Sequence, residues 1–327
     1  MLDVRRISVR IRSATYQAEG INSYEFEPAG EDRLPPFEPG SHIDVFLPGN
    51  IVRQYSLCND AADDNRYVIG VQREEAGRGG SRLLFECARP GAILQISEPR
   101  NHFSLSKTSP SHLFLAGGIG ITPMMSMIRT LGREGKPFEL HYCTRSPEKT
   151  AFRRELAAIR PAGCVHFHHD NGNPAEGLDI ASLLAEPRAD TALYYCGPPG
   201  FMAAIRAACE GWPPENVHFE YFEAPAADPA AGGGSSPGGE PRDFTVKLAG
   251  TGQEFLVPVG RTIVEVLREN GIDIPTSCEA GVCRTCLTRY LSGTPEHHDY
   301  ILEDEERGEY VLPCCARSLS DVLVLDL

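Results

Sequence analysis

A group of cysteines near the C-terminal end limits the fold of this chain most strongly. Cys278, Cys283 and Cys286 follow the spacing C-x₄-C-x₂-C, and Cys314 and Cys315 come later in the chain. This is the spacing of plant-type [2Fe–2S] proteins, in which four thiolates hold the cluster. The three clustered cysteines are expected on one tight loop. The fourth ligand, Cys314 or Cys315, is expected from a distant strand.

A structural zinc site is the alternative for these cysteines. Zinc sites usually pair their ligands in two C-x₂₋₄-C knuckles. Here three cysteines cluster and the remaining ligand is remote, which fits the iron–sulfur pattern better. The motif therefore predicts a centre that carries one electron at a time.

Length and charge narrow the classes of function. At about 100–200 residues per domain, a chain of 327 residues predicts two or three domains. The net charge is −14, with 45 acidic against 31 basic residues, which argues against a nucleic-acid partner. The chain has no long apolar run and its N-terminus has no apolar core, so neither a membrane span nor a signal peptide is expected. Eleven cysteines without an export signal then indicate reduced thiols and a cytoplasmic protein.

Residues 1–106 predict an antiparallel β-barrel. Short runs of alternating apolar and polar residues are separated by Gly and Pro, as in closed antiparallel barrels. A glycine-rich segment opens a short helix over 79–87. The expected strands span 4–13, 22–27, 42–47, 53–58, 67–73 and 93–97.

Residues 107–224 predict an α/β domain with a parallel sheet. Apolar runs alternate with helical segments, the first of which extends to Arg133. The expected strands span 112–116, 138–144, 165–169, 192–196 and 217–222.

Residues 225–241 predict a flexible linker, because Gly, Ala, Pro and Ser dominate them. Residues 242–327 predict a small α+β domain with a hairpin over 244–248 and 254–259. Thr262 and Glu265 form a capping box that opens a helix reaching about Asn270. Further strands are expected over 285–291, 310–314 and 322–325.

The predicted barrel carries a candidate flavin site. Arg53, Tyr55 and Ser56 on one strand offer a cation for phosphate, a planar ring and a hydroxyl donor. The segment Gly79-Gly80-Ser81 adds backbone N–H groups at a helix start, which is another anion site. Alone, a tyrosine in a strand is usually a core residue, and the pairing of the two motifs favours the flavin.

The predicted parallel sheet carries a candidate dinucleotide site. Gly118, Gly120, Thr122 and Pro123 follow a strand and open a helix, where such sheets bind pyrophosphate, although a tight turn is the alternative. A second loop at the end of a later strand should face the same crevice. That loop consists of Cys196, Gly197 and Pro198. Arg145 and Asp170 follow two other strands, as candidates for the adenosine half or as solvated loop charges.

Histidines raise the question of a second metal site. His166 and His168 share one face of a predicted strand, but no neighbouring carboxylate or cysteine pattern completes a ligand set. A strand with polar exposure is therefore expected for 165–169. A surface loop is expected for His297 to Asp299 on the same grounds.

Taken together, these motifs resemble the phthalate dioxygenase reductase family, which includes the vanillate O-demethylase reductases. The resemblance covers the whole chain and includes the domain order, with the ferredoxin at the C-terminus. It implies a ferredoxin–NADP reductase-like flavin and nucleotide pair followed by a β-grasp ferredoxin. The segments that carry it are 53–59, 77–81, 116–123, 196–198, 218–222 and the cysteine motif.

The resemblance implies FMN rather than FAD, NADH as electron donor and a Rieske-type oxygenase as partner. It implies hydride transfer near Thr122 and Cys196 with no residue acting as acid or base, and Cys314 as the fourth cluster ligand. Arg284 stands where the family usually has Gly, which places a long cation at the rim of the cluster. The residues implied around FMN are Arg53, Tyr55, Ser56, Gly80, Ser81, Thr122 and, stacked near the ring, Phe222.

Two other functions fit parts of the sequence. A stand-alone flavin reductase or NADH oxidase would need no second protein, so a strict requirement for a protein acceptor would exclude it. A zinc-bearing interaction module would be colourless when purified.

Overall fold

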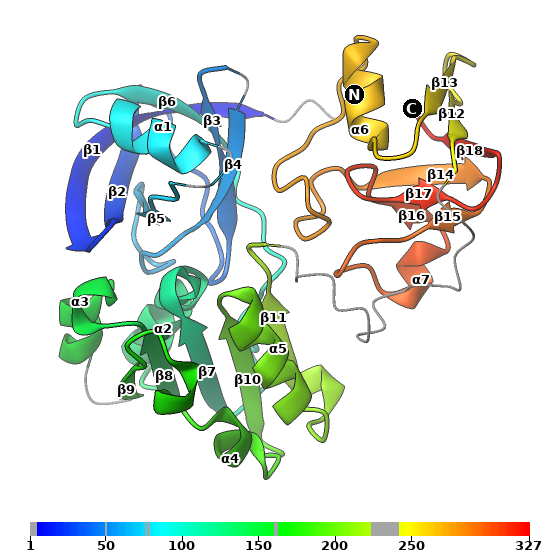
Figure 1. Ribbon diagram of the computed structural model, residues 1–327. Coiled ribbons are helices and arrows are strands. Elements are labelled where there is room, and N and C mark those ends of the chain that lie inside the picture. Colours follow the sequence, from blue (N-terminus) through cyan, green and yellow to red (C-terminus); the bar gives the residue numbers. More distant parts are fainter. Residues whose placement is uncertain (1–4, 50, 76, 78, 160–162, 224–241) are drawn as a thin grey trace. The chain divides into compact units, whose positions relative to one another are not determined.

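The computed structural model describes residues 5–49, 51–75, 77, 79–159, 163–223 and 242–327. The chain divides into two compact units, one that ends at Phe222 and one that begins at Glu223 (Figure 1). The predicted linker, 225–241, lies outside the described residues. The domain limits at 106, 224 and 241 remain predictions. In the part of the chain that the structure describes, we find no helix with the length and apolarity of a membrane span.

The first half of the N-terminal unit is a six-stranded antiparallel barrel, as predicted. Its strand order is β4-β3-β6-β1-β2-β5. A bridge between Leu57 and Ile69, with the Cys58 N–H bonded to the Val68 carbonyl at 2.7 Å, joins the two ends of this order. The helix α1 (Gly80–Cys87) packs on the barrel and begins after Gly79, which has a φ of 79°. The strands are β1 (Arg6–Ala18), β2 (Ile21–Pro28), β3 (His42–Leu47), β4 (Ile51–Ser56), β5 (Tyr67–Gln72) and β6 (Ile93–Ser97).

The second half of this unit is a five-stranded parallel sheet, which confirms the predicted α/β domain. Its order is β11-β10-β7-β8-β9, with all neighbouring strands parallel. The chain adds β8 and β9 on one side of β7 and then β10 and β11 on its other side, so the switch point lies between β7 and β10. Ligands bind at such a switch point, outside the carboxyl ends of the strands. The strands are β7 (Ser111–Gly117), β8 (Phe138–Thr144), β9 (Gly163–His169), β10 (Thr191–Cys196) and β11 (Val217–Glu220), and the helices are α2 (Ile121–Glu134), α3 (Arg153–Ala158), α4 (Ile180–Leu184) and α5 (Pro199–Ala208).

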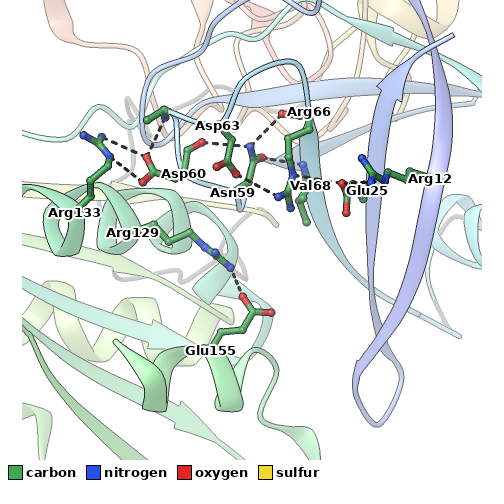
Figure 2. Close-up of polar contacts among 11 residues, drawn as sticks. Arg12, Glu25, Asn59, Asp60, Asp63, Arg66, Val68, Arg129, Arg133 and Glu155 are labelled. Atoms are coloured by element: carbon green, nitrogen blue, oxygen red, sulfur yellow. Dashed lines mark hydrogen bonds and ion pairs between the residues drawn. The ribbon is translucent and has the colours of Figure 1, made fainter. Parts of the chain in front are cut away.

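Charged side chains join the barrel to the parallel-sheet half. Asp60, in the loop after β4, accepts a hydrogen bond from Arg133 Nε on α2 at 2.9 Å (Figure 2). Thr130 Oγ1, also on α2, donates a second hydrogen bond to Asp60 at 3.4 Å. Asn59 holds the same loop by binding the Val68 N–H at 2.9 Å and the Arg66 carbonyl at 3.1 Å. Burial alone would raise the pKa of Asp60, but the bonds from Arg133 and its neighbours outweigh this and lower it.

We expect Asp60→Asn to destabilise the N-terminal unit by about 1 kcal/mol at neutral pH, because it removes a partly buried charged hydrogen bond. The lowered pKa means that this stabilisation is present above the unfolded value of 3.8 and is lost as the pH falls further. Urea unfolding at pH 7 measures the effect. Asp64→Asn is the control, since Asp64 pairs with Arg33 at an exposed site. Equal losses in the two variants would contradict a joining role for Asp60.

The C-terminal unit is a mixed α+β fold. Its main sheet has the order β13-β12-β18-β14-β16, with β12 and β18 parallel, and β15 pairs with β17 in a separate ribbon. The predicted capping box of Thr262 and Glu265 is present at the start of α6 (Ile263–Glu269). The remaining elements are β12 (Phe244–Leu248), β13 (Glu254–Val257), β14 (Thr288–Ser292), β15 (Pro295–Glu296), α7 (Asp304–Arg307), β16 (Tyr310–Val311), β17 (Arg317–Ser318) and β18 (Val322–Leu325).

Two expectations for this unit are wrong. The predicted strand over 310–314 ends at Val311, because the Leu312 carbonyl accepts the N–H groups of Cys315 and Ala316 at 3.0 and 2.9 Å in a tight turn. Cys314 therefore lies in a turn and not on a strand. Asp299, expected in a surface loop, is buried and accepts the Leu302 N–H at 2.8 Å.

Candidate functional site

The flavin motif of the barrel comes together at the start of α1. The side chain of Arg53, on β4, lies directly over Gly80, so that a Cβ on Gly80 would fall 2.4 Å from Arg53 Nε and 2.6 Å from its Cγ. The guanidinium is thereby held beside the first N–H groups of an eight-residue helix. Ser81 uses its hydroxyl to accept the Glu74 N–H at 3.0 Å, which fixes the loop before the helix. A cation beside the N–H groups of a helix start suits a phosphate, so the residues fit the flavin phosphate that the sequence predicts here.

Two of the residues predicted to lie near the flavin ring, Tyr55 and Ser56, belong to β4. Tyr55 is half-buried against the barrel core, and burial raises the pKa of its hydroxyl, which keeps the phenol protonated. Ser56 is buried at the end of the strand. Thr122, the second residue of α2, is also buried, with its hydroxyl bonded to the Ile119 carbonyl at 2.9 Å and its methyl group against Gly70 of β5. Phe222 is 37% exposed after β11.

The two glycine turns of the parallel sheet form one surface, as expected at the switch point. A Cβ on Gly120 would lie 2.2 Å from the Cys196 carbonyl oxygen and 2.8 Å from the Gly197 nitrogen. A Cβ on Gly117 would lie 2.8 Å from Pro198 Cδ. The turn after β7 and the turn after β10 thus touch backbone to backbone. Gly118 has a φ of 54°, a conformation that favours glycine.

Arg145 and Asp170 also end up together, at the carboxyl ends of β8 and β9. The Asn171 N–H binds the Arg145 carbonyl at 2.9 Å, and the Asp170 N–H binds the Thr144 carbonyl at 3.3 Å. The Asp170 carboxylate accepts the Gly172 N–H at 2.8 Å, which shapes the turn. Arg145 is exposed. Their predicted contact with the adenosine half of a dinucleotide therefore remains a prediction.

Glu220, the last residue of β11, is a site residue to which the sequence analysis gives no role. Cys196 lies opposite it in the ladder, the Glu220 side chain is only 14% exposed, and Ser56 is a close enough neighbour to act on its pKa. Burial raises its pKa to about 8, against a smaller lowering by Ser56. His42 lies 3.9 Å away and is neutral, because burial lowers its pKa to about 3. The detectable signal was an acidic residue inside an otherwise uncharged strand, 217–222.

The cysteine loop of the C-terminal unit has the geometry of a thiolate site. The N–H groups of Ala280 and Val282 each point at Cys278 Sγ at 3.4 Å, and the Cys278 N–H points at Cys283 Sγ at 3.4 Å. Backbone donors aimed at sulfur stabilise thiolates and sulfides. Gly281 has a φ of 72°, and a Cβ there would lie 2.8 Å from Cys315 Sγ. The loop therefore requires glycine at 281.

The remaining thiols converge on the same place. The Cys314 thiol is within hydrogen-bonding reach of the thiols of Cys278, Cys286 and Cys315. Cys283, Cys286 and Cys314 are buried, whereas Cys315 is partly exposed and directs its thiol to the Leu312 carbonyl at 3.5 Å. Four buried or half-buried thiols with backbone donors fit a [2Fe–2S] cluster. Cys314 is the better placed of the two candidates for the fourth ligand.

Arg284 is not a free cation at the rim of the cluster loop. Its guanidinium binds both oxygens of Glu306 at 2.6 and 2.7 Å and the Ile301 carbonyl at 2.8 Å. The hydrogen bond from Arg284 lowers the pKa of Glu306 and keeps the carboxylate charged. Arg284 has a φ of 59°, so the residue adopts a backbone conformation that favours glycine and ties the loop to α7.

Two family models match the chain. The model of the 2Fe-2S iron-sulfur cluster binding domain matches residues 246–319, and that of the oxidoreductase NAD-binding domain matches residues 114–207. Each lies where the structure has the corresponding fold, the α+β unit and the parallel sheet.

Curated proteins and solved structures match over nearly the full length. The reductase subunit of a tert-butanol monooxygenase / tert-amyl alcohol desaturase from Aquincola tertiaricarbonis is 45% identical over 98% of this chain and 96% of its own. A vanillate O-demethylase oxidoreductase from Pseudomonas sp. is 43% identical over 98% of this chain and all of its own. The solved structure of a phthalate dioxygenase reductase, described as modular for electron transfer from pyridine nucleotides to [2Fe-2S], is 40% identical, covers 98% of both chains and has a TM-score of 0.74. The chain therefore belongs to the phthalate dioxygenase reductase family of oxidoreductases.

Proposed function

We propose that this protein takes electrons from NADH through FMN and a [2Fe–2S] cluster and delivers them to a Rieske-type oxygenase. The observation that carries the proposal is the presence, in one chain, of three built sites. These are the Arg53–Gly80 cradle, the contacting glycine turns at 117–120 and 196–198, and the thiol cluster around Cys314. The full-length relatives include reductase subunits of oxygenase systems, which supports an oxygenase as the acceptor.

The residues around the flavin and the dinucleotide bind and orient. Arg53 and the N–H groups of α1 would hold the FMN phosphate, and the turns at Gly118 and Gly197 would hold the dinucleotide diphosphate. Thr122 and Cys196 lie at the two turns of the switch point, where the nicotinamide would meet the flavin. When bound, the flavin accepts a hydride and the cluster carries single electrons, so the chain itself needs no acid or base.

Glu220 would keep a proton beside Ser56 at neutral pH, because its pKa is raised to about 8 by burial. A neutral carboxyl group there would keep a negative charge away from the flavin and hold the Ser56 hydroxyl in place. Cys196 is also kept neutral, since burial raises the pKa of its thiol well above its usual value. The site is thus lined by uncharged groups where hydride transfer would take place.

The experiment that tests the proposal is an anaerobic titration of the purified protein with NADH, followed by visible absorption. We expect flavin bands and an iron–sulfur shoulder that both bleach, and turnover that depends on an added oxygenase. Flavin bands that bleach without an iron–sulfur contribution, in protein reconstituted with iron and sulfide, would indicate a bare flavin reductase. A colourless protein would indicate zinc and contradict the proposal.

We expect Glu220→Gln to change how stability depends on pH. With a folded pKa of about 8 and an ordinary value of 4.5, the wild-type carboxyl group binds more protons when folded, so wild-type stability falls as the pH rises between these values. The glutamine variant lacks this fall. The free energy of unfolding of the variant, relative to that of the wild type, should therefore increase by at most about 5 kcal/mol from pH 4.5 to 8. Urea unfolding at pH 5, 6.5 and 8, with flavin at constant excess, measures it.

Glu215→Gln provides the matched control, since Glu215 is exposed just before β11. Its difference from the wild type should not change with pH in this range. A constant difference for Glu220→Gln as well would mean that Glu220 is ionised in the folded protein, and the neutral lining would be wrong.

A further inference from the structure

The sheet face of β8 and β9 opposite the apolar core is lined with metal-binding side chains. Leu140, Tyr142, Val165 and Phe167 pack into the core with α2 and α3. Because side chains alternate along a strand, the intervening residues share the opposite face. In the parallel register Glu139 pairs with Cys164, His141 with His166 and Cys143 with His168.

Three of these side chains have the separations of metal ligands. The ligand atoms of Glu139, His141 and His166 all lie within 4.8 Å of one another. Glu139 Oε1 is 3.0 Å from His141 Nε2 and 3.7 Å from His166 Nε2. Ligands bound to zinc at about 2.0–2.2 Å lie roughly 3–4 Å from each other. An ion can therefore be accommodated among these atoms with small side-chain movements and no change in strand register.

A second layer of contacts holds two of the ligands. His141 Nδ1 lies 3.0 Å from His168 Nε2, so the tautomer with its proton on Nδ1 can donate it to His168 and offer the Nε2 lone pair to a metal in place of the contact with Glu139. Glu139 Oε2 accepts a hydrogen bond from Arg188 at 2.8 Å, which leaves Oε1 directed at the two histidines. Metal-binding histidines and carboxylates are usually oriented in this way by outer partners.

The ligand side chains combine burial with access from solvent. Only 9% of the His141 side chain is exposed, so its position is held by the surrounding strands. His166 is 42% exposed at its side chain, which gives an ion a route from solvent. Cys164 Sγ lies 3.1 Å from His166 Nε2 and is also exposed, so the fourth position can take a thiolate or a water molecule.

We propose that Glu139, His141 and His166 form a binding site for a divalent transition-metal ion, with zinc as the expected occupant. Two imidazoles and one carboxylate are a zinc ligand set that leaves a position open, and imidazole nitrogen selects against Mg²⁺ and Ca²⁺. The site lies along the strands, away from the glycine turns at their carboxyl ends. The bound ion would link the edge strand β9 to β8 and stabilise the nucleotide-binding half. From the sequence alone a metal at His166 is considered and set aside, because no carboxylate completes the ligand set. The structure supplies that carboxylate from Glu139, which belongs to the neighbouring strand and is brought there only by the register of β8 and β9.

The test uses the complete chain with its cluster loaded, checked by iron content, so that the cluster cysteines do not take up zinc. Equilibrium dialysis against Zn²⁺ should show one ion bound per chain. His166→Ala should weaken this binding on the order of 100-fold, since loss of a ligand costs at least as much as the 10–100-fold typical of an outer partner. His298→Ala is the matched control, because His298 is similarly exposed at 46% and lies in the other unit.

A second readout covers the case in which His166→Ala does not fold. Zn²⁺ should raise the melting temperature of the wild type and of His298→Ala, but not that of Glu139→Gln, which removes the ligand charge and keeps the shape of the side chain. The proposal is overturned if wild-type protein binds no stoichiometric zinc. It is equally overturned if the His166 or Glu139 variant binds zinc as tightly as the control.

Discussion

Cys314→Ser should lose the iron–sulfur cluster, while Cys315→Ser should keep it. The two thiols are adjacent in sequence, but Cys314 is buried within reach of Cys278 and Cys286, whereas Cys315 turns to the Leu312 carbonyl. A serine oxygen at 314 would replace a thiolate ligand that the cluster needs. We therefore expect the rate of electron transfer to a protein acceptor such as cytochrome c to fall by about 100-fold or more in Cys314→Ser. Loss of a residue that only orients a metal ligand typically costs about 10–100-fold, and loss of the ligand itself should cost more.

The measurements separate the two halves of the reaction. Iron and sulfide content report the cluster, and reduction of a dye that accepts electrons directly from flavin reports the N-terminal unit. Dye reduction should stay within about twofold of wild type in both variants, since no proposed flavin or dinucleotide ligand is changed. If Cys315→Ser loses its iron and Cys314→Ser retains it, the fourth ligand is Cys315. Loss of dye reduction in Cys314→Ser would mean that the dye receives its electrons through the cluster and not directly from the flavin.

Local patterns in the sequence were enough to predict most of the fold. The six barrel strands, the five parallel strands and the capping box of α6 each depend on residues close together in the chain. The three-cysteine loop is equally local. The error at Cys314 arises because a turn takes the place of the predicted strand. Two hydrogen bonds to the Leu312 carbonyl form this turn, and the pattern of apolar and polar residues does not predict them.

The site features that could not be predicted from the sequence depend on partners far away in the chain. Arg284 stands as a long cation in the sequence, but Glu306 neutralises it across 22 positions. Glu220 gains its raised pKa from burial beside Ser56, which comes from another strand in the other half of its unit. Glu139 joins His166 only through the register of β8 and β9. Only the last pairing follows from the order of strands in one sheet. The first depends on how the cysteine loop meets α7 and the second on how the barrel packs against the parallel sheet, and local sequence patterns indicate neither.

Gly120→Ala should have the largest effect on the flavin half of the reaction. The new Cβ would lie 2.2 Å from the Cys196 carbonyl oxygen and 2.8 Å from the Gly197 nitrogen, and both are backbone atoms that cannot rotate away. The turn after β7 and the turn after β10 must then separate. Overpacking of this kind costs about 1–3 kcal/mol of stability. A displacement of about 1 Å in the positioning of reactants can lower a rate by about 100-fold.

We therefore expect reduction of the bound flavin by NADH to slow by about 10–100-fold in Gly120→Ala, measured by stopped-flow absorption. The iron content should be unchanged, because the cluster loop lies in the other compact unit. Gly132→Ala is the matched control, because Gly132 lies in α2, the helix that follows Gly120. Its new Cβ would lie 3.5 Å from Ile159, an ordinary contact distance, and alanine in a helix should be neutral or stabilising. Wild-type rates in Gly120→Ala would show that the two turns do not form one dinucleotide surface. Equal slowing in both variants would trace the effect to α2 as a whole.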